Sequence, residues 1–291
     1  MPLINPLADA DGTWIRGSFH GHCDEHSACS SVPLVDSLRQ YEEVGAGFVT
    51  LTDHDHITDL GPARQQYPEL AFLHGFEYST RENVVFCGDS VDELFRLSLE
   101  EALTKAGDLL TIVCHPQPMG AAREYWTRPK LEALGTMPDG IEVYNGHYGT
   151  PTGRANGRQP LYNDFWDELL TAGHHVWGFG NDDFHDPEDF SNAWNMVRVD
   201  DVSATGVVIA AKSGRSYATT GLLLENLIVD GDHVEVHVSA DAKGRFVGPG
   251  ALVLASGEGA RFSYDAGDEA YVRFEAESDA GRIFLQPLWK T

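Results

Sequence analysis

The sequence predicts an α/β protein whose strands form a barrel, followed by a small β-rich C-terminal region. Strand-like apolar runs alternate with helix-like segments through about the first two-thirds of the 291 residues, which is typical of a parallel sheet with helical connections. Residues with metal-binding side chains follow several of these runs directly. A βα barrel builds its active site at the carboxyl ends of several strands, whereas an open doubly wound sheet uses one switch point, so the pattern favours the barrel.

The α/β part begins with a strand predicted at residues 14–22 and a helix at 33–44, in which Leu34, Leu38 and Tyr41 have helical spacing. Further strands are predicted at 48–52, 70–78, 109–114, 141–144, 175–180 and 196–199. Further helices are predicted at 91–106, 161–172 and 203–212.

After residue 212 the pattern changes to short strands separated by glycine and aspartate turns. Strands are predicted at 226–229, 233–238, 251–255, 271–277 and 282–285, with hairpin connections at residues 231–232 and 257–258. We therefore expect a barrel domain over residues 1–221 and a β-sandwich-like domain over residues 222–291. A β unit of about 70 residues seldom stands alone without packing on a larger one.

The composition excludes several classes of function. The chain has 20 Lys and Arg against 45 Asp and Glu, which gives a formal charge of −25. Such a charge repels nucleic acid polymers and anionic membranes. The sequence shows neither a signal-peptide pattern nor an apolar run of about 18 residues, so we expect a soluble cytoplasmic protein. No obligate protein partner is evident.

Two pairs of polar residues have the spacing of a metal site. His20 and His22 are two positions apart, as are Asp183 and His185, and such residues of a strand point to the same side. Between the pairs, at the ends of other predicted strands, lie His54, Glu77 and His115. Imidazoles and carboxylates suit zinc, iron or manganese. The sequence therefore predicts metal-assisted hydrolysis.

Six short motifs resemble the PHP (polymerase and histidinol phosphatase) superfamily. They read RGSFHGH at residues 16–22, TDH at 52–54, GFE at 75–77, CHP at 114–116, IEVYN at 141–145 and GNDDFH at 180–185. A stretch at residues 212–221, followed by strands, is similar to the two-domain branch that includes carbaryl-hydrolase-like proteins. The resemblance implies a distorted (β/α)7 TIM-like barrel (the PHP fold) that carries two or three divalent metal ions.

The resemblance also implies roles for individual residues. His20, His22, Glu77 and Asp183 would hold a first metal, Glu77 and His115 a second, and His54 and His185 a third. Glu77, His54, Asp183 and His185 would be catalytic. The chain departs from the family pattern at two positions, where His26, or less well Asp24, replaces an expected aspartate ligand and Asn83 replaces a histidine.

The resemblance and the site chemistry favour a metal-dependent phosphoesterase, in which metal-activated hydroxide attacks a small phosphorylated metabolite. Arg154, Arg158 and Asn145 are the candidate substrate-binding residues, because a phosphate needs positive charge and hydrogen bonds beyond the metals. The alternative is a metal-dependent carboxylic ester, carbamate or amide hydrolase, whose pocket would be more apolar and lined by Tyr144, Trp126 and Trp177. A metal or ligand sensor without catalysis is a second alternative.

Other polar residues are expected to be structural or supporting. The four cysteines at positions 23, 29, 87 and 114 form no CxxC pair and are predicted to be free buried thiols. Asp53 and Asp55 flank His54 and are expected to orient an imidazole, and Glu142 and Asn145 could do the same. The histidines at positions 74, 147, 174 and 175 are the first that we leave out of the site.

Overall fold

A continuous hydrogen-bonded sheet runs through the computed structural model, which describes residues 2–8, 12–120 and 125–290. The α/β part supplies β2 (Thr13–Ser18), β3 (Phe48–Leu51), β4 (Ala71–Tyr78), β5 (Val84–Gly88), β6 (Leu110–Val113), β7 (Gly140–Asn145), β8 (Trp177–Asn181), β9 (Trp194–Val199) and β10 (Ser216–Thr219). The β-rich part supplies β11 (Leu224–Asp230), β12 (His233–Gly248), β13 (Leu252–Asp265), β14 (Tyr271–Ser278), β15 (Gly281–Leu285) and β16 (Leu288–Lys290), and β1 (Leu3–Ile4) pairs with β16.

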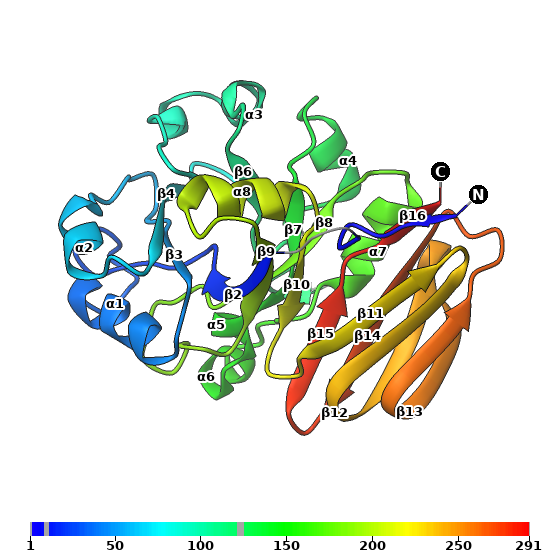
Figure 1. Ribbon diagram of the computed structural model, residues 1–291. Helices are drawn as coiled ribbons and strands as arrows, with labels where there is room; N and C mark the ends of the chain where they lie inside the picture. Colours follow the sequence, from blue (N-terminus) through cyan, green and yellow to red (C-terminus); the bar gives the residue numbers. More distant parts are fainter. Residues whose placement is uncertain (1, 9–11, 121–124, 291) are drawn as a thin grey trace.

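The helices connect strands of the α/β part (Figure 1). They are α1 (Leu34–Glu43), α2 (Gly61–Gln66), α3 (Leu99–Lys105), α4 (Arg128–Glu132), α5 (Gly146–Gly149), α6 (Pro151–Ala155), α7 (Asn163–Thr171) and α8 (Ala204–Lys212), with 3-10 turns η1 (Leu94–Arg96) and η3 (Pro249–Ala251). The predicted helix at 91–106 is therefore too long. It begins at Leu99 because Ser98 and Glu101 form a capping box, in which the Ser98 side chain accepts from the Glu101 N–H.

The sheet of the α/β part contains both parallel and antiparallel strand pairs. β2, β3 and β4 are parallel, as are β6, β7 and β8, while β5 is antiparallel to both β4 and β6. β9 returns antiparallel to β2 and continues the sheet into β10 and β15. A mixed α/β sheet is thus confirmed, with more antiparallel pairing than the sequence pattern predicts.

A closed TIM-like barrel is not confirmed. The sheet order ends at β8, and no ladder in the described part of the chain joins β8 to β9 or β2. β8 nevertheless lies against β9, where the Asn195 amide accepts from Gly180 N–H at 3.0 Å and donates to Gly180 O at 2.7 Å. A side chain of β9 therefore takes the place of main-chain pairing at this seam.

The β-rich part has its own apolar core and lies beside the α/β part, with the two ends of the chain near each other (Figure 1). The turn at residues 231–232 joins β11 to β12, as predicted. The hairpin predicted at residues 257–258 is wrong, because Gly257 and Glu258 pair with Gly244 and Lys243 inside the long β12–β13 ladder. The connection between β12 and β13 is formed by η3 instead.

Candidate metal centre

Backbone contacts bring the two histidine-containing motifs together. Beyond the end of β2, the His22 N–H donates to Phe184 O at 3.0 Å, and the Asp183 N–H donates to His20 O at 3.2 Å. These bonds form an isolated parallel bridge between Gly21 and Phe184. Residues 20–22 and 183–185, far apart in the sequence, therefore lie side by side with their side chains at a common point.

His20, His22, Glu77 and Asp183 form the buried centre of the cluster. The Nε2 atoms of His20 and His22 are 3.2 Å apart. His20 Nε2 lies 3.4 Å from Glu77 Oε2 and 3.1 Å from Asp183 Oδ1. His22 Nε2 lies 3.4 Å and 3.3 Å from the same two oxygens. Two imidazole nitrogens and two carboxylate oxygens thus face one small volume.

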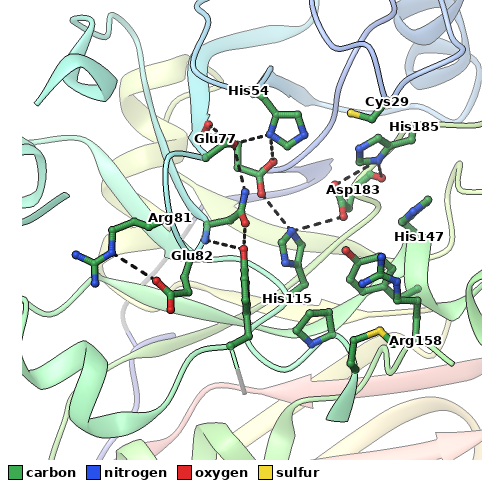
Figure 2. Close-up of a pocket in the computed structure, with 16 residues that line it drawn as sticks. Cys29, His54, Glu77, Arg81, Glu82, His115, His147, Arg158, Asp183 and His185 are labelled. Carbon is green, nitrogen blue, oxygen red and sulfur yellow. Dashed lines mark hydrogen bonds and ion pairs between the residues drawn. The ribbon is translucent and has the colours of Figure 1, made fainter. Parts of the chain in front are cut away.

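His115 and His54 approach Glu77 from either side of this centre (Figure 2). His115 Nε2 is 3.1 Å from Glu77 Oε1, and His54 Nδ1 is 2.9 Å from Glu77 Oε2. Glu77 is held for this role at the end of β4, where its N–H donates to Thr52 O and Asp53 O. Its two oxygens therefore face different imidazoles, as the predicted bridging role requires.

His185 lies beside His54 and His22 at the other end of the cluster. The ligand atoms of His22, His54 and His185 all lie within 4.8 Å of one another. His185 Nδ1 is 2.7 Å from Asp183 O, and His54 Nδ1 is 2.6 Å from Ser79 Oγ. Both rings are thus fixed through Nδ1, which leaves Nε2 of each as the nitrogen for a ligand.

Buried polar residues behind the cluster hold its imidazoles in place. Glu142 Oε1 is 2.8 Å from His20 Nδ1, and Glu142 Oε2 accepts from the His115 N–H at 2.7 Å. Asn145 Nδ2 donates to Glu142 Oε2 at 3.0 Å and to Asp183 Oδ2 at 3.1 Å. Fixing the second ring nitrogen of a metal-binding histidine sets its tautomer and orientation. Glu142 and Asn145 occupy the orienting positions expected of them.

Asp53 orients His22 through a serine. Ser27 Oγ donates to Asp53 Oδ1 at 2.6 Å and lies 3.3 Å from His22 Nδ1, whereas Asp53 itself is 3.9 Å from that nitrogen. Cys23, whose thiol also bonds Asp53, is buried and points away from the cluster. Asp55 accepts from the Ser79 N–H, so its contact with His54 is indirect.

Two site residues have strained backbones. His115 has φ of 25° and Asp183 has φ of 51°, in a region that non-glycine residues seldom adopt. Such conformations persist where the surrounding structure fixes them, and they are concentrated at functional sites. The hydrogen bonds of Glu142 to His115 and of His20 to Asp183 supply that restraint here.

The donor set fits divalent metal ions. Glu77 Oε2 and Asp183 Oδ1 are buried and accept no well-formed hydrogen bond, although three imidazoles face each of them. Buried carboxylate oxygens without donors are costly unless a cation compensates them. The imidazole nitrogens lie close to one another and to the same carboxylate oxygens. One shared cation would bind both kinds of atom.

The protonation states of Glu77, Asp183 and His22 also suit metal binding. Burial opposes ionisation of both acids, but His20 and its neighbours hold the pKa of Glu77 and the pKa of Asp183 well below their usual values. Burial, together with His185, lowers the pKa of His22 to about 4, so this ring is neutral at pH 7. Ionised carboxylates and neutral imidazoles are the forms that bind metals.

An open pocket of about 700 Å³ gives access to the cluster. Its wall includes Glu77, His115 and Asp183 together with Tyr125, Tyr148 and Arg158 (Figure 2). Arg158 lies over the Tyr148 ring at 4.9 Å and forms no ion pair with an acid of the described residues. Arg81, at the opposite side, is already paired with Glu82 and Glu100.

Four predicted residues lie differently from expectation. His26 is exposed and stacks on His56 at 4.0 Å, away from the pocket wall, because its loop turns outward after Cys23. Asn83 does line the pocket, but its amide oxygen accepts from Tyr125 and its nitrogen donates to Ser79. Arg154 is exposed on α6 and does not reach the pocket. Asn145 is buried behind Asp183, so it does not line the pocket either.

The pocket wall also includes His147 and Cys29, which were not predicted as site residues. His147 lines the wall, and its Nδ1 is 2.9 Å from the buried Asp189. Cys29 also lines the wall and is exposed, which corrects the expectation of four buried thiols; the other three are buried. The i,i+2 spacing that identifies strand ligands does not apply to either residue, because Cys29 lies in a turn and His147 in the short helix α5.

Comparisons with family models and with curated protein sequences give no match. A solved structure does match over nearly the whole chain. It is a two-domain protein from Bacteroides vulgatus ATCC 8482 containing a predicted PHP-like metal-dependent phosphoesterase, with a TM-score of 0.55, 16% identity, and coverage of 96% of this chain and 97% of that one.

Two shorter matches each cover 59% of this chain and 88% of the other. One is a provisionally assigned metal-dependent phosphoesterase from Bifidobacterium adolescentis ATCC 15703, with a TM-score of 0.41 and 16% identity. The other is an amidohydrolase from Chromobacterium violaceum with bound sulfate and no metal, with a TM-score of 0.40 and 14% identity. The full-length match confirms a PHP-like two-domain fold, and the similarity to carbaryl-hydrolase-like proteins stays a prediction.

None of the described helices is both long enough and apolar enough to span a membrane.

Proposed function

We propose that the chain is a metal-dependent phosphoesterase that hydrolyses a small phosphorylated metabolite. His20, His22, Glu77 and Asp183 would hold a first divalent ion, and Glu77 with His115 a second. His54 and His185 would hold a third ion. Zinc, iron or manganese would suit these imidazole and carboxylate donors. Bound ions of this kind lower the pKa of coordinated water and neutralise charge that develops on phosphate oxygens.

Arg158 is the observation that favours a phosphate over a neutral substrate. Its guanidinium has no acidic partner among the described residues, although the chain carries 45 acidic residues against 20 basic ones. It lies on the wall of the same pocket as Glu77, His115 and Asp183. A guanidinium binds phosphate oxygens through two parallel hydrogen bonds. An unpaired arginine beside the carboxylates therefore suits an anionic substrate.

The alternative of a carboxylic ester, carbamate or amide hydrolase has less support. The three aromatic residues expected to line its apolar pocket lie elsewhere: Trp126 is fully buried, Tyr144 packs on Phe284, and Trp177 donates to Lys212 O. The pocket wall instead has acids, histidines and an arginine beside its two tyrosines.

His147 is the residue best placed to give a proton to the leaving alcohol. Its Nδ1 faces Asp189, which also accepts from the His185 and Asp186 N–H groups and is thereby fixed. The remaining nitrogen, Nε2, is the one that can serve a substrate in the pocket. A carboxylate that holds one ring nitrogen orients the imidazole and stabilises its protonated form, which is the form that gives up a proton from Nε2 in general acid catalysis.

Turnover of two esters of the same chromophore tests the proposed function. Protein loaded with zinc or manganese should cleave p-nitrophenyl phosphate faster than p-nitrophenyl acetate. Arg158→Met should raise the KM for the phosphate by about 10-fold or more, because charge-assisted hydrogen bonds contribute about 1.5–3 kcal/mol. Arg154→Met is the matched control, since Arg154 lies outside the pocket. Faster cleavage of the acetate, with no effect of Arg158→Met, would reject the phosphoesterase.

A further inference from the structure

We propose that the Cys29 thiolate is a ligand of the third metal position, together with His54 and His185. This inference deepens the proposed function, because it assigns a residue of this chain to the metal centre that the function requires. It also explains why His26, the ligand expected from the sequence, is not needed. His26 stacks on His56 at the surface, whereas Cys29 lies on the pocket wall next to both imidazoles.

The Cys29 side chain lies on the wall of the same pocket as the rings of His54 and His185. Figure 2 shows the sulfur on the same side of the pocket as these two rings. Each ring has its Nδ1 atom occupied, in His54 by Glu77 and Ser79 and in His185 by the Asp183 carbonyl. Among the described residues, the Nε2 atoms of both rings and the Cys29 sulfur are therefore available as donors at this end of the cluster.

The imidazoles point to a cation independently of the cysteine. The ligand atoms of His22, His54 and His185 gather within 4.8 Å of one another. His185 is only 8% exposed, and no hydrogen bond to its Nε2 from a nitrogen or oxygen is found in the part of the chain that the structure describes. A nearly buried ring nitrogen that makes no such hydrogen bond and lies among other imidazoles is in the position of a metal ligand.

The loop that carries Cys29 is fixed to both histidines. Ser30 Oγ donates to His185 O at 3.0 Å, and the Ser31 N–H donates to the same carbonyl at 2.8 Å. On the other side of Cys29, Ser27 Oγ accepts from the His54 N–H at 3.4 Å and is bonded to Asp53. Cys29 therefore lies between two anchored residues, so that its sulfur is held beside the imidazoles before any ligand binds.

One thiolate and two imidazoles form a set of three protein ligands typical of catalytic zinc, with a fourth position open to water or substrate. Thiolate is a soft donor that favours zinc over magnesium, calcium or manganese. The centre formed by His20, His22, Glu77, Asp183 and His115 offers only nitrogen and oxygen donors. A Cys29 thiolate would therefore favour zinc at the third position.

Cobalt substitution tests the ligation directly, without a measurement of turnover. Cobalt-loaded protein should show a thiolate-to-metal charge-transfer band in the near ultraviolet, and Cys29→Ser should abolish it. Cys87→Ser is the control, because Cys87 is buried in β5 and belongs to none of the candidate metal-binding groups of the described residues. A band that is absent from the wild type, or that survives in Cys29→Ser at equal cobalt content, would overturn the assignment.

Thiol labelling provides a second readout, since Cys29 is the one exposed cysteine of the four. Zinc should slow the reaction of DTNB with the native chain about 10-fold or more, in both the wild type and His26→Ala. His54→Ala should remove most of this protection, because loss of even an outer-shell partner weakens metal binding about 10–100-fold. Zinc-loaded wild type that labels at the metal-free rate, or full protection in His54→Ala, would contradict the proposal.

The two proposals fail in different ways. Turnover of the phosphate ester without the cobalt band would reject Cys29 as a ligand and leave the phosphoesterase standing. The band and the zinc protection without any phosphate turnover would support the thiolate site and reject the proposed reaction.

Discussion

At the scale of single residues, Glu142 organises much of the cluster. Its carboxylate faces His20 Nδ1, accepts from the His115 N–H, and accepts from the side-chain amides of Asn145 and Asn181. It is fully buried within β7. Glu142 faces the Nδ1 atom of His20 and the main-chain N–H of His115, not the Nε2 atoms that would bind a metal. It therefore acts as a positioning residue for His20 and His115.

Glu142→Gln should weaken zinc binding by about 10–100-fold, as is typical when the partner behind a ligating histidine is lost. The amide has the shape of the carboxylate but only one acceptor oxygen, so at least one of its four donors loses its partner. Competition with a zinc-binding dye measures the change, and circular dichroism checks the fold. Glu258→Gln on exposed β13 should have no effect. Equal zinc affinity in Glu142→Gln and wild type would show that His20 needs no such support.

At the scale of elements, close contact between β2 and β3 determines where His20 and His22 lie. Gly17 is paired with Phe48 of β3 and with Asn195 of β9. A side chain at position 17 would overlap the carbonyl oxygen and the ring of Phe48. Since β2 leads directly into His20 and His22, its spacing from β3 is transmitted to the metal cluster.

Gly17→Ala should lower the free energy of unfolding by about 1–3 kcal/mol through overpacking against Phe48. Metal affinity should fall as well, because β2 must move to make room. Gly257→Ala is the matched control, since a methyl group there makes only ordinary contacts, and its effect should stay within about 0.5 kcal/mol. Thermal unfolding and a zinc titration measure both effects. A Gly17→Ala protein as stable as wild type would contradict the close packing.

Most of the elements, and part of the site, could be predicted from the sequence. Alternating apolar runs predict most strands of the α/β part, and the i,i+2 spacing identifies the two motifs that the fold brings together. The periodicity of residues 91–98 resembles a helix, but the capping box at Ser98 makes helix α3 begin only at Leu99. Cys29 and His147 have no periodic signal, since Cys29 lies in a turn and His147 in the four-residue helix α5, and tertiary contacts bring both to the pocket. The glycine at position 257 resembles a turn but lies in a paired strand.

At the scale of the whole molecule, a buried ionic network joins the β-rich part to the α/β part. Arg273 of β14 donates to Asp167 of α7 through Nε at 2.7 Å and also pairs with Glu275. Asn163 of α7 donates to Glu275 at 3.2 Å. The arginine side chain is fully buried, so each of these charges depends on the others for compensation. Together with the β10–β15 ladder, the network makes the two parts interdependent.

Arg273→Met should destabilise the protein by about 3–5 kcal/mol, because it leaves Asp167 and Glu275 as buried acids without their main partner. Arg282→Met is the matched control, since Arg282 forms a partly exposed pair with Glu277 that contributes about 0–1 kcal/mol. Urea unfolding of both variants measures the difference. Similar losses in the two variants would mean that the buried network does not stabilise the junction.

Metal content of the purified chain tests most directly whether residues from both halves of the sequence hold divalent ions at one pocket. Protein prepared without chelator and then loaded with zinc should retain at least two ions per chain after gel filtration, as in other multi-metal hydrolytic sites. Asp183→Asn should lose at least one of them while keeping its fold. A folded wild-type chain that retains no stoichiometric metal after loading would contradict the metal centre and the hydrolytic function built on it.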